Sequence, residues 1–94
     1  MHGEYKMPGG KLIVADLEVH AGKLAQVQIS GDFFLEPDSA LAVIDMALEG
    51  LRADAGKQQH SFAIQHALGR NVQMYGVSPE AIAMAVQRAL EASH

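Results

Sequence analysis

A strict alternation of apolar and polar side chains, over two consecutive runs, is the feature that most constrains the fold. Apolar residues recur at every second position from Ile13 to Val19 and again from Ala25 to Ile29. A period of two is typical of a β-strand with one buried face and one solvated face. The runs are joined by a short segment in which Gly22 can supply the positive φ of a tight turn. The pattern therefore predicts an antiparallel hairpin of residues 12–20 and 23–30.

The alternation also predicts which side chains of this hairpin face the helices. The inward side chains are expected to be Ile13, Leu17, Val27 and Ile29, together with Ala25. Asp16 and Glu18 then lie on the outer face, because a register shift of one residue moves every side chain across a sheet. Short flanking strands are expected at Phe33–Leu35 and, as an edge strand, at Glu4–Met7, which Pro8-Gly9-Gly10 would end.

The second half of the chain has the signals of helices. A first helix is expected from Pro37, a residue that suits the first helical turn, to about Gly50. Residues 52–59 are polar and predict a loop, and a short helix is expected over Ser61–Leu68. Ser78-Pro79-Glu80 is a strong start signal for a last helix that runs to about Ala92.

These elements predict one α+β domain over residues 1–94, since 94 residues leave room for a single core. A small antiparallel β-sheet, formed by the N-terminal hairpin and short strands, is expected over about residues 11–36. About three helices over about residues 37–93 are expected to pack on one face of this sheet.

The charge balance disfavours a nucleic-acid-binding protein. Seven Lys and Arg residues against eleven Asp and Glu residues give a formal net charge of −4, whereas such proteins present a basic surface. No apolar run approaches the roughly 20 residues that span a bilayer, and the first six residues contain no signal-peptide segment. We therefore expect a cytoplasmic protein that binds neither nucleic acid nor membrane.

The residues also offer no catalytic or metal-binding constellation. The absence of cysteine excludes disulfides, thiolate metal sites and a thiol nucleophile. The five histidines are scattered, and His60 and His66 would lie on different sides of a helix, so they are expected to be solvated or incidental. Gly9-Gly10-Lys11 is followed by Leu12 and a strand, whereas a phosphate-binding loop needs Ser or Thr and then a helix. No catalytic residue and no metal site are expected.

Two short segments remain as candidates for a binding surface. Gly9 and Gly10 allow close approach of the backbone to a ligand or partner, and Lys11 offers a positive charge near an anion. A flexible turn followed by an edge lysine that discourages aggregation explains the same residues equally well. Phe33 and Phe34 are adjacent on a strand, so one should enter the core and the other should face outward as a partner anchor.

Asp32 lies beside the two phenylalanines, where Gly31-Asp32 is a natural turn. General acid–base catalysis needs a pocket that shifts the pKa of a carboxyl group, and an exposed carboxylate usually lacks one. Asp32 is therefore a candidate for surface contacts rather than for catalysis.

Three segments of the chain resemble the C-terminal accessory domain of lipoate–protein ligases. They are Lys6-Met7-Pro8-Gly9-Gly10-Lys11-Leu12, Leu17-Glu18-Val19-His20-Ala21-Gly22-Lys23-Leu24 and Val27-Gln28-Ile29-Ser30-Gly31-Asp32-Phe33-Phe34-Leu35-Glu36-Pro37. The resemblance covers about residues 5–51, and Gly76-Val77-Ser78-Pro79-Glu80 is similar too. The sequence is most similar to the two-part archaeal and bacterial form, in which this domain is a separate small protein.

The resemblance implies a non-catalytic accessory subunit, required with a large catalytic subunit for the activation of lipoate to lipoyl-AMP and for protein lipoylation. In this family the large subunit holds lipoate, ATP and Mg, and transfers the lipoyl group to a lysine of an acceptor protein. This chain alone would then bind no cofactor and show no ligase activity, and its contact with the acceptor would be indirect. The residues expected at the interface with the partner and its adenylate are Lys6, Gly9, Gly10, Lys11, Asp32, Phe33 and Phe34. The alternative is a stand-alone interaction or regulatory module with the same fold and no role in lipoylation.

Overall fold

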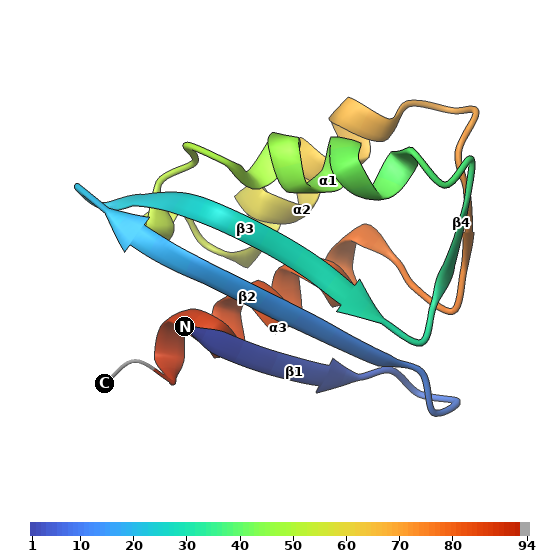
Figure 1. Ribbon diagram of the computed structural model, residues 1–94, viewed down its shortest axis with the longest axis horizontal. Coiled ribbons are helices and arrows are strands. Elements are labelled where there is room, and N and C mark those ends of the chain that lie inside the picture. Colours follow the sequence, from blue (N-terminus) through green and yellow to red (C-terminus); the bar gives the residue numbers. More distant parts are fainter. Residues whose placement is uncertain (93–94) are drawn as a thin grey trace.

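The computed structural model describes residues 1–92, in which five strands and three α-helices form (Figure 1). In chain order the elements are β1 (His2–Lys6), β2 (Leu12–His20), β3 (Lys23–Gly31), β4 (Phe34–Glu36), α1 (Ala40–Leu48), α2 (Lys57–Leu68), β5 (Gln73–Tyr75) and α3 (Pro79–Glu91). A single 3₁₀ turn at Ala53–Ala55 lies between α1 and α2.

The strands form two antiparallel sheets, and the helices pack against one face of the larger one. β1, β2 and β3 pair in that order, while β4 pairs with β5. α3 packs on β1 and β2, α1 packs on β3, and α2 contacts both of these helices (Figure 1). The buried apolar side chains of sheet and helices form one core. This architecture confirms the expected α+β class.

β2 and β3 form the expected hairpin with the expected faces. Ile13, Leu17, Val27 and Ile29 are each at most 6% exposed, whereas Glu18 is exposed and Asp16 partly so. Ala21 and Gly22 both adopt positive φ, at 54° and 78°, as the two-residue hairpin turn that matches strand twist requires.

One position of β3 departs from the expected alternation. The pairing of β2 with β3 shifts between Asp16 and Glu18, and Gln26 opposite this point has a φ of 51°. The extra residue of this β-bulge moves the side chains of the preceding β3 residues to the opposite faces of the sheet from those that the alternation predicts. Leu24 is therefore buried, and Ala25, which was expected to face inward, is only partly covered.

Carboxylates of α1 and its C-cap bind the outer edge of β3. Glu49 accepts hydrogen bonds from the N–H groups of Gln26 and Val27 at 2.7 and 3.0 Å, and Asp45 accepts one from the N–H of Ile29 at 3.0 Å. Burial raises the pKa of the Asp45 carboxyl above its usual value, although the Ile29 hydrogen bond opposes this effect. Outward N–H groups of an edge strand are thus satisfied within the chain.

The segment after α1 completes this edge. The N–H of Leu24 donates to the carbonyl of Leu51, and the N–H of Gly50 donates to the carbonyl of Leu24, both at 2.8 Å. The N–H of Ala53 donates to the carbonyl of Gly22 at 2.8 Å. The β3 edge is therefore occupied from the hairpin turn to Ile29.

The helices begin at different residues from those expected. α1 begins at Ala40, because a turn in which Ala40 N–H donates to the Pro37 carbonyl at 3.0 Å precedes it. Pro37 thus lies before the helix and not in its first turn. α2 begins at Lys57, so that the last three residues of the predicted loop are helical. The expected start of α3 is confirmed, since Ser78 Oγ accepts from Ala81 N–H at 3.1 Å.

His60 is a core residue, contrary to the expectation that the histidines are solvated or incidental. Its side chain is 0% exposed, and its Nε2 lies 3.0 Å from the carbonyl oxygen of Arg52. This contact ties the first turn of α2 to the segment that follows α1. His60 therefore has a structural role.

A glycine allows α3 to lie directly against β1. A Cβ atom at Gly3 would lie 2.2 Å from the backbone nitrogen of Ala89 and 2.5 Å from the carbonyl oxygen of Ala85. The facing side of α3 carries small buried residues, Ala81, Ala85 and Ala89. None of the helices within residues 1–92 is long and apolar enough to cross a membrane.

Candidate functional site

The glycine-rich segment forms the turn between β1 and β2. The N–H of Gly10 donates to the carbonyl of Met7 at 2.9 Å, and the N–H of Met7 donates to the carbonyl of Lys11 at 2.8 Å. Gly9 and Gly10 have φ of 101° and 100°, and the space around both is open. The two glycines are thus needed for the shape of the turn, and their backbone is exposed at its tip.

The segment that leaves β3 and the segment after β5 lie beside this turn. Asp32 N–H donates to the carbonyl of Leu12 at 3.0 Å, which fixes the exit from β3 against the start of β2. The alkyl stem of Lys11 covers Gly76, where an added Cβ would lie 2.7 Å from the Lys11 Cγ. We call residues 6–12, 31–34 and 75–76 the glycine-turn surface. This definition includes the seven residues predicted from the sequence, whose role in binding stays a prediction.

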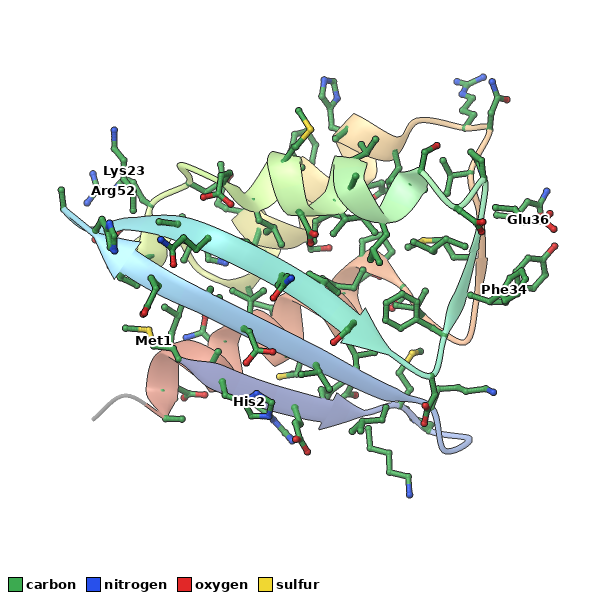
Figure 2. All side chains as sticks on the ribbon, viewed as in Figure 1. Met1, His2, Lys23, Phe34, Glu36 and Arg52 are labelled. Carbon is green, nitrogen blue, oxygen red and sulfur yellow. The ribbon has the colours of Figure 1, made fainter. Side chains whose placement is uncertain are left out.

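The two phenylalanines divide as predicted. Phe33 is partly buried against the core, while Phe34 is 58% exposed and points away from β4 (Figure 2). The Phe34 ring meets the Tyr75 ring edge-on, with centroids 5.9 Å apart and planes at 74°. A shallow depression of about 260 Å³ lies beside them, lined by Phe33, Phe34, Leu35, Asp38 and Leu41. An exposed aromatic pair of this kind is typical of contact surfaces.

The charges of this surface are mixed, and none is enclosed. Lys6, Lys11 and Asp32 are all exposed, and within residues 1–92 none of them forms an ion pair. Nor do three or more His, Cys, Asp or Glu side chains gather there, or elsewhere in the described part of the chain, to hold a metal ion. The arrangement supports contact with another molecule and provides no buried acid or base.

Tyr75 and Gly76 belong to the site and were not predicted. β5 is only three residues long, so it gives no periodic signal, and its pairing with β4 joins segments far apart in the sequence. Tyr75 comes directly before Gly76-Val77-Ser78, the segment that precedes α3. An aromatic residue just before a helix start is the sequence signal that could have marked it as a site residue.

A second cluster that was not predicted lies on the outer face of β1 and β2. The His2 ring nitrogens lie 2.7 Å from an Asp16 oxygen and 2.8 Å from a Glu4 oxygen (Figure 2). Hydrogen bonds to Glu4 and Asp16 raise the pKa of His2 above 6.5. His2 is therefore bound to side chains of both β1 and β2 and is not an incidental histidine.

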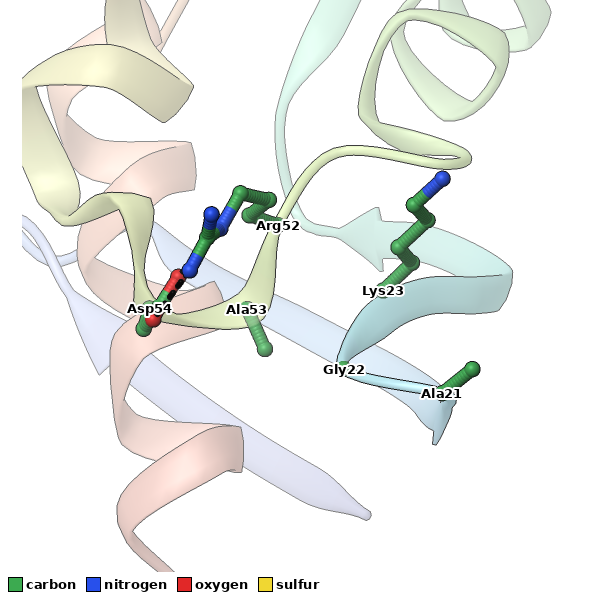
Figure 3. Close-up of a pocket in the computed structure, with 6 residues that line it drawn as sticks. All are labelled: Ala21, Gly22, Lys23, Arg52, Ala53 and Asp54. Carbon is green, nitrogen blue, oxygen red and sulfur yellow. Dashed lines mark hydrogen bonds and ion pairs between the residues drawn. The ribbon is translucent and has the colours of Figure 1, made fainter.

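The other end of the β2–β3 hairpin carries a depression of about 310 Å³ between the turn and the segment after α1 (Figure 3). Lys23 and Arg52 bring positive charge to it, but both Asp54 carboxylate oxygens bind the Arg52 guanidinium at 2.9 Å. Because this guanidinium already has a carboxylate partner, an anion would have to displace Asp54. The glycine-turn surface is the stronger candidate.

Comparison with known proteins gives one informative match. No family model and no curated protein sequence matches the chain. Among solved structures, the fold matches a chain from an archaeal lipoylation system, a bi-partite lipoate protein ligase and its E2 lipoyl domain from Thermoplasma acidophilum. The TM-score is 0.70 at 25% identity, covering 92% of this chain and 97% of that chain. The structural match confirms the resemblance seen in the residues: this chain shares its fold, over nearly its whole length, with a component of a bipartite lipoate–protein ligase system.

Proposed function

We propose that this chain is the non-catalytic accessory subunit of an ATP-dependent lipoate–protein ligase. It acts with a large catalytic subunit in the activation of lipoate to lipoyl-AMP and so in protein lipoylation, in the cytoplasm. The large subunit holds ATP, Mg and lipoate, and the acceptor protein meets this chain only through it.

The observation that carries this proposal is the structural match to the bipartite ligase system, which covers both chains almost completely. The match extends over 92% of this chain and 97% of that chain, so it involves the whole fold rather than a shared segment. Among residues 1–92 no group of three or more His, Cys, Asp or Glu side chains could hold a metal ion, which is compatible with a non-catalytic role.

The glycine-turn surface is the proposed contact with the large subunit. Phe34 is the anchor, because it is the largely exposed aromatic residue there and Tyr75 supports it edge-on. Lys11 lies on the same surface with its stem on Gly76, where its ammonium group can stabilise phosphate charge of the adenylate bound to the partner.

Reconstitution with the candidate large subunit tests the proposal. The two proteins should co-purify, and lipoyl-adenylate should form from ATP and lipoate only when both are present. Lipoyl-adenylate formed by this chain alone would exclude the accessory role. If the large subunit neither binds this chain nor responds to it, the stand-alone interaction module is the correct interpretation.

A matched pair of variants tests the docking surface. Phe34→Ala should weaken the complex about 30-fold or more, as truncation of an aromatic anchor typically does, while the chain remains folded. Met46→Ala is the control, because Met46 is 75% exposed on α1, outside the glycine-turn surface. Equal effects of the two substitutions on binding would exclude this surface as the interface.

A further inference from the structure

The two edges of the three-stranded sheet differ in how their backbone groups are satisfied. On β3 the outward groups are bound by Glu49, Asp45 and the segment after α1. On either side of β1, the Met1 carbonyl accepts from Leu17 N–H of β2 and Met7 N–H donates to the Lys11 carbonyl just before β2. The even-numbered residues of β1 therefore direct their N–H and C=O groups away from the sheet. Within residues 1–92 the outward N–H groups of His2, Glu4 and Lys6 have no recorded acceptor, and β1 is a free edge (Figure 1).

One side chain partly covers this edge. Arg88 of α3 donates from Nη1 to the Glu4 carbonyl at 3.2 Å, and its guanidinium carbon lies 5.1 Å from the centre of the Tyr5 ring. Arg88 is exposed, so a second strand can replace its single bond to Glu4. The free edge is therefore blocked less firmly than the edge of β3.

The outward-facing side chains of β1 alternate in charge. His2 and Lys6 flank Glu4 on the exposed face of the sheet. Charged side chains on an edge strand, Lys above all, discourage pairing with another strand. An alternation of signs instead permits an identical strand to pair antiparallel with opposite charges facing each other.

Three antiparallel registers place more than one outward residue of each β1 strand opposite an outward residue of the other copy. Pairing about Glu4 sets Glu4 against Glu4 and His2 against Lys6, which are like charges when His2 is protonated. Pairing about Gly3 relies on His2, whose ring is already held by Asp16 and Glu4. Pairing about Tyr5 sets Glu4 of each copy against Lys6 of the other. Glu4 contacts His2 through Oε2 alone, which leaves Oε1 for this Lys6, and Lys6 forms no ion pair within residues 1–92.

The two copies of α3 would lie on the same face of the joined sheet, because α3 packs over β1 and β2 in each copy. At Gly3 the backbone of α3 lies directly on β1. Phe34 and Tyr75 belong to the other sheet and take no part in the pairing.

We propose that the β1 edge binds a second copy of this chain, antiparallel about Tyr5, with two Glu4–Lys6 pairs across a continuous six-stranded sheet. The inference does not rest on the proposed role in lipoylation, although Lys6 belongs to both surfaces. It rests on the free backbone groups of β1 and on the self-complementary order of its charges.

Sedimentation equilibrium of the full chain at low ionic strength tests the proposal. The wild-type protein should form a reversible dimer, and a protein that stays monomeric at about 1 mM would overturn it. Glu4→Lys and Lys6→Glu should each raise the dissociation constant about tenfold or more, because each converts two opposite-charge pairs into like-charge pairs.

Mixing the two variants gives the sharpest result. In the mixed dimer, Lys at position 4 of one chain faces Glu at position 6 of the other, and the remaining pair is Glu4 with Lys6. The mixture should therefore associate as tightly as the wild-type protein. Single variants that associate normally, or a mixture that does not recover, would overturn the register and the proposal.

Gln28→Lys is the control, since it adds a charge on the same outer face but on β3. It should leave the association unchanged, and a loss as large as that of Lys6→Glu would show that β1 is not the interface. Circular dichroism confirms that each variant is folded. Should Glu4→Lys unfold because it removes a partner of His2, Lys6→Glu still tests the register.

Discussion

Replacing Gly3 with alanine should destabilise the protein through a collision with α3. The added Cβ would lie 2.2, 2.5 and 2.7 Å from three backbone atoms of Ala85 and Ala89, whereas unstrained carbon contacts lie at about 3.5–4.0 Å. These neighbours belong to a helix backbone and cannot rotate aside as a side chain does. α3 must therefore move by about 1 Å away from β1.

The magnitude follows from two opposing effects. Overpacking of a core contact costs about 1–3 kcal/mol. Gly3 does not have the positive φ that favours glycine, so alanine recovers about 0.4–1 kcal/mol by restricting the unfolded chain. A net loss of about 1.3 kcal/mol in the free energy of unfolding is expected, which lowers the Tm of a domain of this size by about 5–10 °C.

Urea and thermal unfolding measure this loss, and amide chemical shifts report where it arises. Gly22→Ala is the matched control: the space around Gly22 is open, but its φ is 78°, so its cost of about 1 kcal/mol is conformational. Only Gly3→Ala should change the amide chemical shifts of Ala85 and Ala89. A Gly3→Ala protein as stable as the wild type, with these amides unmoved, would refute the reasoning.

Three further predictions concern charged groups. Lys11→Ala should change the free energy of unfolding by less than about 0.5 kcal/mol, yet slow adenylate formation by the reconstituted ligase about tenfold to a hundredfold; unchanged activation would leave only the edge-lysine interpretation. The NMR titration of His2 should have a midpoint above 6.5, because Glu4 and Asp16 stabilise its charged form; its stabilising effect is complete below the unfolded pKa and is lost as pH rises through the raised value. Glu49→Gln should cost about 1 kcal/mol and speed hydrogen exchange of the two amides that the carboxylate binds, whereas the exposed Glu36→Gln should do neither.

The parts of the fold that sequence reasoning found are those with local, repeated signals. The alternation of apolar and polar residues in β2 and β3 correctly predicted which of their side chains face the helices. The N-cap residue Ser78 correctly predicted where α3 begins. At Gln26 the alternation failed, because the bulge is held by Glu49 from an element 23 residues away. A periodicity argument contains no information about such a partner.

Sequence reasoning identified part of the candidate surface, again the part that has local sequence signals. The glycine turn and the two phenylalanines carry their own conformational signals, so their positions could be predicted. Tyr75 contacts Phe34 because two three-residue strands, β4 and β5, pair with each other. Strands this short have no periodic sequence pattern from which the pairing could be predicted. His60 was misjudged because its burial depends on how α2 packs, and nothing local distinguishes a core histidine from a solvated one.

The contact between β1 and α3 also sets the order in which the chain can fold. β2 and β3 are joined by a two-residue turn and can pair early, but the bond between Arg88 and Glu4 spans 84 residues. Closing so long a loop brings a large entropic cost before its contacts stabilise anything. On the ribosome, the inner face of β1 therefore stays uncovered until residues 79–91 emerge, and the first strand of the sheet is among the last to be packed.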